Sequence, residues 1–301
     1  MFEGFAEYDV RVGQTTIHAR VKGSGPPLLL LHGYPQTHVM WQKIAPRLAE
    51  RFTVVCSDLR GYGASGKPPA DASHAAYAKR AMAADQVELM AALGFHRFRL
   101  VGHDRGARVA HRMALDHPAQ VARLALLDIV PTRTVFATVN QAVATGYYHW
   151  FFLIQANGLP ERLIGADPDY YLRHKLNQWS GPDKSAFGDE AIEAYLEAFR
   201  NPETIHASCE DYRAAASIDL EHDAADIDSR IRCPVLVLWG EHGLVHRNYD
   251  VLAVWRERAN DVRGRPLPCG HYLPEECPEE TLAELLAFLS EGDAGDQPER
   301  R

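Results

Sequence analysis

The sequence RLVGHDRGARVAHRMA at residues 99–114 decides the fold. Its apolar opening predicts a strand over 98–103, and the residues that follow predict a helix over 105–117. Two glycines flank Asp104 here, in the pattern Gly-x-nucleophile-x-Gly. Such glycines allow a tight turn from strand to helix, which lifts the central side chain above the carboxyl end of the strand. The sequence therefore predicts that Asp104 is presented as a nucleophile.

A carboxylate at this position implies a particular chemistry. Serine in the same turn attacks carbonyl carbon, whereas a carboxylate attacks saturated carbon and forms an alkyl ester. The alternative is that Asp104 only N-caps the following helix, because Asp is favoured at that position. Capping requires neither the two glycines nor the partners described next, so we favour the nucleophile.

Two partners for Asp104 follow later strands, in the chain order expected for such a turn. A strand predicted over 123–127 ends in Asp128, and His271 follows the last, weaker strand. His271 would activate the water that hydrolyses the ester, and Asp128 would hold the imidazole tautomer. Taken alone, Asp128 would be almost as typical of a turn, and His271 of a surface loop. Their order and their positions after strands favour catalysis.

Two further strand ends bear on this site. The turn HGYP follows an apolar strand and aims the backbone N–H of Tyr34 at the same point as the N–H of Arg105. These two amides are the predicted oxyanion hole. Glu241 follows another strand and is an alternative acid, but Gly243 stands where an Asp would be expected. Asp128 is therefore the preferred acid.

Strands alternate with helices along most of the chain, which predicts an α/β fold with a mostly parallel sheet flanked by helices. An antiparallel hairpin precedes the parallel strands. The predicted strands are 8–12, 15–22, 27–32, 53–57, 98–103, 123–128, 234–239 and 262–267. The predicted helices are 38–50, 77–93, 105–117, 248–259 and 278–290. Pro46 kinks or splits the first of these helices.

The alternation stops between residues 135 and 218, where aromatic residues are dense and no strand is predicted. Gly-Pro, Asp-Pro and Asn-Pro steps divide this stretch into several helices. We therefore predict a core of residues 1–134 and 219–290, an inserted helical cap of 135–218, and a polar tail of 291–301.

Composition narrows the class of protein. Of the 301 residues, 46% are hydrophobic and 24% are charged, which excludes collagen-like, coiled-coil and wholly disordered chains. The net charge of −8, without a long basic run, argues against a nucleic-acid or anionic-membrane surface. The longest apolar run is too short to cross a bilayer, and the acidic start is unlike a signal peptide. Five cysteines without a CxxC pair fit a reduced, cytoplasmic compartment.

Five parts of the sequence resemble one superfamily. HGYP, DLRGYGAS, GHDRGARVAHR, Asp128 and GHYLPEECPE are similar to the motifs of dehalogenases and epoxide hydrolases with the α/β-hydrolase fold. A finer resemblance, to the fluoroacetate (haloacetate) dehalogenase family, rests on Arg105, Arg108, the His149-Trp150 pair and EDYR at 210–213. It covers nearly the whole chain. It implies hydrolysis of a haloacetate, fluoroacetate above all, to glycolate and halide.

The resemblance directs attention to further residues. Arg105 and Arg108 lie beside the nucleophile, where two guanidinium groups would bind the substrate carboxylate in a fork and keep the nucleophile ionised. The structural alternative is that one arginine pairs with an acid of the fold. The family places its halide contacts on His149, Trp150 and Tyr212; by composition alone, the two aromatic residues would be core residues.

Hydrolysis through an enzyme carboxylate needs only water, so we predict no cofactor and no metal. GYGAS at 61–65 lacks the lysine of a phosphate loop, and His242 with His246 lacks a third ligand. The expected partners are a small haloacetate and water, and the resemblance implies a homodimer. Two other functions stay open. One is an epoxide hydrolase with the same triad, in which Tyr148 and Tyr212 protonate the epoxide; the other is a silent relative that binds a small acid without turnover.

Overall fold

One eight-stranded sheet forms the centre of the computed structural model, which describes residues 1–291. The strands lie in the order β1–β2–β4–β3–β5–β6–β7–β8. Their bounds are β1 Ala6–Val12, β2 Thr15–Lys22, β3 Pro27–Leu31, β4 Thr53–Ser57, β5 Phe98–His103, β6 Val121–Leu127, β7 Val235–Gly240 and β8 Val262–Leu267. β2 pairs antiparallel with β1 and β4, and the remaining pairs are parallel. The predicted mostly parallel sheet with an antiparallel hairpin at its edge is confirmed.

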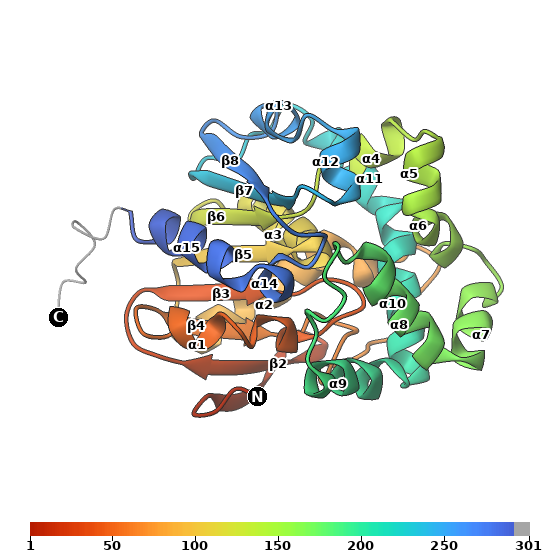
Figure 1. Cartoon of the computed structure of the whole chain (residues 1–301), viewed down its shortest axis with the longest axis horizontal. Coiled ribbons are helices and arrows are strands. Elements are labelled where there is room, and N and C mark those ends of the chain that lie inside the picture. The colour runs from red at the N-terminus through yellow and green to blue at the C-terminus, as the bar shows by residue number, and fades with distance from the viewer. Residues whose placement is uncertain (292–301) are drawn as a thin grey trace.

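The burial of each strand follows from its sequence and its place in the sheet. β7, with the sequence VLVLWG, is buried at every residue, and β3 is buried at all but its first residue. Figure 1 shows α15 in front of the sheet and α2 and α3 behind it, so both faces of the central strands are covered. β8 lies at the edge of the sheet and alternates between exposed and half-buried residues before a buried end. This explains its weaker apolar signal.

The helices around the sheet are shorter than predicted in two places. Their bounds are η1 His38–Trp41, α1 Ala45–Leu48, η2 Ala75–Tyr77, α2 Lys79–Ala92, α3 Asp104–Asp116, α12 Leu244–Asn248, α13 Val251–Arg256, α14 Leu273–Glu276 and α15 Pro278–Leu289. The segment 38–50 is split, with Pro46 in the first turn of α1. The helix predicted over 248–259 is confirmed only over Val251–Arg256, as α13, and Asn248 is the last residue of the separate helix α12. The Asp250 carboxylate caps α13 by accepting the N–H of Ala253, so α12 has already ended.

Eight helices connect β6 to β7, which are neighbours in the sheet. They are α4 Thr132–Ala137, α5 Gln141–Gly146, α6 Tyr148–Leu153, α7 Leu159–Ala166, α8 Pro168–Trp179, α9 Asp189–Phe199, α10 Pro202–Ala215 and α11 Ile218–Ala225. Figure 1 shows most of them gathered on one side of the sheet, at the right of the view. The predicted limits of the cap fall within α4 and at the first residue of α11, and the division into core and cap stays a prediction.

Two remaining features complete the comparison with the sequence. No helix within residues 1–291 is both long enough and apolar enough to cross a membrane. The predicted polar tail of 291–301 lies outside the described residues, apart from Glu291.

Candidate active site

Asp104 stands where β5 gives way to α3 and the chain turns sharply. Its backbone φ is +46°, in the left-handed region that residues with a side chain rarely adopt. A Cβ on Gly102 would lie 2.6 Å from the Cα of Ala107. A Cβ on Gly106 would lie 2.4 Å from the carbonyl oxygen of His32. Both flanking positions therefore require glycine, as the pattern predicts.

The Asp104 carboxylate does not cap its helix. His103 occupies the N-cap position, and Asp104 Oδ1 instead accepts the backbone N–H of Tyr34 at 2.9 Å. The capping alternative is therefore wrong. The Arg105 amide, the second amide of the predicted oxyanion hole, makes no hydrogen bond to this carboxylate. Within residues 1–291, Asp104 Oδ2 has no hydrogen-bond partner either, so one oxygen is held and the other is free.

Asp128 and His271 lie together at the ends of their strands. His271 Nδ1 is 2.6 Å from Asp128 Oδ2, and Asp128 Oδ1 accepts the N–H of Gly240 at 3.0 Å. The alternative acid, Glu241, is exposed and pairs with the neighbouring His242 at 3.5 Å. The structure thus brings Asp128, and not Glu241, against the imidazole. This arrangement leaves Nε2 of His271 as the nitrogen that can accept a proton from water.

The charges around the site favour an ionised nucleophile. Burial raises the pKa of Asp104, but electrostatic interactions with His271, His103 and the two arginines outweigh burial, and the pKa lies below its usual value. Burial lowers the pKa of His271, whereas the hydrogen bond and charge of Asp128 raise it more, to above the ordinary 6.5. A carboxylate that stays charged, beside a histidine whose pKa is raised by an acidic partner, suits the roles of nucleophile and base.

Arg105 is turned toward an acid rather than left free. Its Nε donates to Asp211 Oδ2 at 2.9 Å, and its Nη2 donates to Asp211 Oδ1 at 2.6 Å. The prediction that its guanidinium fork is open to the substrate therefore needs correction. The cause is Asp211, which is fully buried. Without this ion pair, the buried charge of Arg105 would lack compensation. Of the three guanidinium nitrogens of Arg105, Nη1 has no hydrogen-bond partner among the described residues.

Arg108 differs, because it has no carboxylate partner within residues 1–291. Its Nη1 donates to the carbonyl of Val130 at 2.9 Å and to Thr132 Oγ1 at 3.1 Å. Its Nε is buried and unpartnered in the described chain, and its guanidinium carbon lies 4.6 Å from the centre of the Trp150 ring. Burial, followed by the charge of Arg105, lowers the pKa of Arg108. An anionic ligand would relieve this repulsion.

The three predicted halide contacts lie together in the helical segment. Tyr212 has its ring 5.4 Å from that of His149 and 6.0 Å from that of Trp150, centre to centre. All three side chains are buried. Tyr212 Oη and His149 Nδ1 have no hydrogen-bond partner in the described range, which is costly unless a ligand or water meets them. Their roles stay predictions, but their polar atoms are available.

Tyr148 does not join this group. Its side chain is 37% exposed, and its ring covers the ammonium of Lys175 at 3.7 Å. The rings that contact Tyr212 within residues 1–291 are those of Tyr34, His149 and Trp150. The pair of cap tyrosines required by the epoxide-hydrolase alternative is therefore not assembled from Tyr148 and Tyr212.

A cavity of about 220 Å³ reaches two of the three triad residues and is lined by further residues that the sequence did not single out. Asp128 and His271 line it, together with Tyr147 and Trp179. Tyr147 stacks on Trp150, with ring centres 5.6 Å apart, and Trp179 accepts the N–H of His271 through its carbonyl oxygen at 2.9 Å. Tyr147 directly precedes Tyr148 and the predicted His149-Trp150 pair, so its position was the available signal. Nothing local in the sequence marks Trp179.

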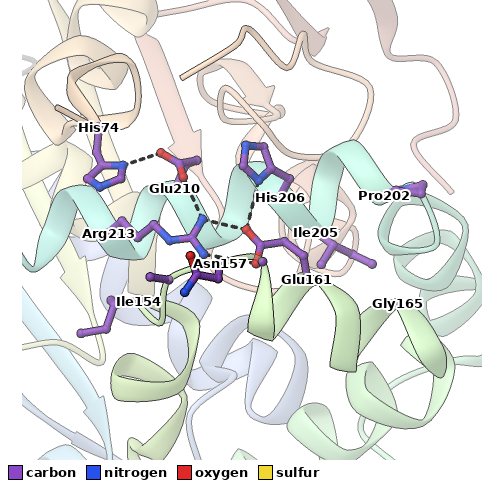
Figure 2. Close-up of a pocket in the computed structure, with 12 residues that line it drawn as sticks. His74, Ile154, Asn157, Glu161, Gly165, Pro202, Ile205, His206, Glu210 and Arg213 are labelled. Carbon is purple, nitrogen blue, oxygen red and sulfur yellow. Dashed lines mark hydrogen bonds and ion pairs between the residues drawn. The ribbon is translucent and has the colours of Figure 1, made fainter. Parts of the chain in front are cut away.

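A larger cavity, of about 590 Å³, is lined mainly by residues of α7 and α10 (Figure 2). Arg213 crosses it and donates to Glu161 at 2.7 Å and to Glu210 at 2.8 Å. Two histidines complete the network, with His74 on Glu210 and His206 on Glu161. None of the predicted catalytic residues lines it. α10 therefore turns Glu210 and Arg213 toward this cavity, while Asp211 and Tyr212 contact Arg105.

Possible metal ligands are already engaged in hydrogen bonds. One ligand atom from each of His18, His38 and Asp58 lies within 4.8 Å of the others. His38 Nδ1 is 2.9 Å from Asp58 Oδ1, which also accepts the His38 N–H, and Asp58 Oδ2 accepts the N–H of Ala64. These bonds join the segment that follows β3 to the segment that follows β4. His246 Nδ1, for its part, accepts the indole N–H of Trp239 at 3.0 Å.

Comparison with known proteins agrees with this geometry. Residues 26–278 match the family described as the alpha/beta hydrolase fold. The chain belongs to that family. This α/β hydrolase is 49% identical to a fluoroacetate dehalogenase from Burkholderia sp over 302 residues, which cover 100% of this chain and 99% of the relative. It is 35% identical to a soluble epoxide hydrolase from Corynebacterium sp. (strain C12), over 91% of this chain and 93% of the relative.

A solved structure of a protein from Nostoc sp PCC 7120 is similar throughout. It shares 59% sequence identity with this α/β hydrolase and superposes with a TM-score of 0.96. The match covers 97% of this chain and 100% of the other. The shared fold therefore includes the helices between β6 and β7 as well as the sheet.

Proposed function

We propose that this α/β hydrolase hydrolyses haloacetates, fluoroacetate among them, to glycolate and halide. The observation that carries the proposal is a buried carboxylate, in place of a serine, at the strand-to-helix turn beside Arg108, which has no acidic partner in the described chain. A carboxylate nucleophile suits saturated carbon, and an uncompensated guanidinium suits a substrate that carries its own carboxylate. The similarity to the Burkholderia fluoroacetate dehalogenase supports the same assignment.

The first chemical step is displacement of the halide. Asp104 Oδ2 attacks the methylene carbon in line with the carbon–halogen bond, and the bonding electrons leave with the halide ion. Asp104 Oδ1 continues to accept the hydrogen bond from the backbone N–H of Tyr34 during this step. Tyr212 Oη, His149 and the indole of Trp150 would replace the solvation that the departing halide loses. Each donor to developing charge is worth roughly 3 kcal/mol, so three approach about 10 kcal/mol before non-additivity.

The second step is hydrolysis of the ester. His271 Nε2 takes a proton from water, and the hydroxide oxygen attacks Cγ of Asp104. Negative charge then develops on Oδ1, where the Tyr34 N–H already lies 2.9 Å away. The bond between Cγ and the glycolate oxygen breaks, and glycolate takes the proton from His271. Asp128 holds the imidazole and stabilises its charged form. One water is consumed and one proton is released with the halide.

The test is halide release from fluoroacetate and chloroacetate, measured with ion electrodes, beside diol formation from styrene oxide. We expect halide release and no diol. The variant His271→Ala should release one halide per enzyme and then stop, with the mass of the protein raised by one carboxymethyl group. Diol formation without halide release would instead establish an epoxide hydrolase. Tight binding of haloacetate without release of halide would establish a silent acid-binding protein.

A further inference from the structure

Asp211 holds Arg105 at three points. The two carboxylate oxygens accept Nε and Nη2, and the backbone carbonyl of Asp211 accepts Nη2 again at 2.9 Å. Both side chains are fully buried. A guanidinium bound in this planar, two-pronged way has no freedom to rotate. Nη1 is the guanidinium nitrogen that remains without a partner within residues 1–291. The direction in which Nη1 can meet a ligand is therefore set by the bonds of Nε and Nη2 to Asp211.

Asp211 is itself fixed by two groups that do not contact the nucleophile. The ammonium of Lys79 forms an ion pair with Asp211 Oδ1, and Tyr62 Oη donates to Asp211 Oδ2 at 2.7 Å. Burial raises the pKa of Asp211, but the charges of Arg105 and Lys79 outweigh it and hold the pKa well below its usual range. Asp211 is therefore a charged, hydrogen-bonded anchor.

The same anchor aligns Arg105 with Tyr212. Asp211 and Tyr212 are consecutive residues of α10, and the guanidinium carbon of Arg105 lies 4.1 Å from the centre of the Tyr212 ring. A cation at this distance over an aromatic face is attracted to it. Movement of Arg105 would therefore disturb both the predicted carboxylate contact and the predicted halide contact. Asp211 therefore positions a residue predicted to bind the substrate carboxylate beside a residue predicted to contact the halide.

The two arginines consequently differ in charge balance. The charge of Arg105 is offset by Asp211, whereas Arg108 has no carboxylate partner in the described chain. Arg105 therefore offers a hydrogen-bond donor of fixed orientation, and Arg108 supplies the uncompensated positive charge. Without Asp211, Arg105 would be a second uncompensated cation and would lose its fixed orientation.

We propose that Asp211, anchored by Lys79 and Tyr62, is a positioning residue that locks Arg105 so that Nη1 alone meets the substrate carboxylate beside Tyr212. This inference rests on the proposed function. It adds a determinant of substrate affinity that lies behind the site and touches no substrate atom.

The decisive variant is Asp211→Asn, which keeps the size of the side chain and removes its charge. We expect KM for chloroacetate and the inhibition constant of glycolate to rise about tenfold or more, because the carboxylate contact loses its orientation, while kcat changes less than KM. The matched control is Asp219→Asn. Asp219 also binds Lys79, with Nζ–Oδ2 at 3.3 Å, but does not contact Arg105, so KM should stay within about twofold of the parent.

Thermal melts establish that each variant is folded before kinetics are compared. An Asp211→Asn protein with the parent KM and glycolate constant, or one in which only kcat falls, would overturn the positioning role. If that variant does not fold, Tyr62→Phe decides, because it removes one hydrogen bond to the same carboxylate and keeps the charge. A rise in KM of about twofold or more supports the proposal, and an unchanged KM overturns it. Failure of the parent enzyme to release halide would instead overturn the proposed function itself.

Discussion

Two groups make up the proposed site: a strand-end group of Asp104, Asp128 and His271, and a helical group of His149, Trp150 and Tyr212. The strand-end group is fixed by the backbone, because its members follow parallel strands and bond to backbone amides or to one another. The helical group is held by ring packing, and two of its polar atoms have no partner in the described chain. In the proposed mechanism, the rigid first group sets which bonds form, and the second group, with these unpartnered polar atoms, sets which leaving group is accepted.

The largest expected effect comes from removing the nucleophile. Asp104→Ala should lose about 10⁴-fold or more in kcat for fluoroacetate and chloroacetate alike, because both reactions need the same ester. Halide electrodes and a thermal melt measure this. Asp183→Asn, on an exposed acid, is the control and should match the parent. Activity on chloroacetate that survived in Asp104→Ala would break the comparison, since a second nucleophile would then exist.

The next effect concerns the acid behind the histidine. Asp128→Asn should lower kcat about 10²- to 10⁴-fold, because the imidazole loses the partner that orients it and stabilises its cation. In the parent, the pKa of His271 is raised above 6.5, and the proposed hydrolysis of the ester needs the neutral imidazole. The parent kcat should therefore fall as the pH drops through a value above 6.5. The variant loses the cause that raises the pKa, so this limb should move to lower pH.

The contribution of His271 to protein stability should depend on pH in the opposite sense to kcat. A raised folded-state pKa stabilises the protein below the unfolded value of about 6.5, and this contribution disappears as the pH rises through the folded value. The gain in thermal stability of the parent over Asp128→Asn should accordingly be larger at pH 6 than at pH 9, as seen in melts at about these values. Equal differences at both values, or an acid limb in the same place, would contradict the assignment of Asp128.

A smaller and selective effect should come from the helical group. Trp150→Phe should reduce kcat for fluoroacetate about 10²-fold and for chloroacetate about tenfold or less, because fluoride needs more hydrogen-bond donation as it leaves. Tyr212→Phe should discriminate in the same direction, since it removes an Oη without a partner among the described residues. Equal losses for the two halides would show that the helical group shapes the cavity and does not assist the leaving group.

The smallest effect is expected at Tyr148. Because its side chain is 37% exposed and lies against Lys175, Tyr148→Phe should leave turnover of both haloacetates within about twofold of the parent. The matched comparison is Tyr212→Phe, in the same assay. A large loss in Tyr148→Phe would revive the pair of cap tyrosines and sharpen the case for an epoxide substrate.

The strand-end group was predictable from the sequence, because the fold dictates where strand-end residues meet. Asp104 follows from two glycines, and Asp128 and His271 follow from chain order after parallel strands. The Asp211 anchor was not predictable. Its partners Arg105 and Lys79 are more than a hundred residues away along the chain, so only tertiary packing brings the charges together.

Helix limits and the helical group were harder for a similar reason. The break in the helix predicted over 248–259 depends on a side-chain cap at Asp250, which competes with an otherwise helical pattern. Aromatic residues such as Trp150 and Tyr212 suit a core as well as a site, so composition could not choose between these roles. Resemblance to a family singled them out, and the structure adds that their side chains lie together.

The central claim is that Asp104 becomes covalently bound to the substrate carbon, and single turnover in water enriched in oxygen-18 tests it most directly. With enzyme in excess over chloroacetate, attack of water on Cγ places the heavy oxygen in the carboxylate of Asp104, and the first glycolate carries an ordinary oxygen from the enzyme. Mass spectrometry of the peptide that contains Asp104 and of the glycolate should show this distribution. Heavy oxygen found directly in the first glycolate, with none in the peptide, would contradict the account.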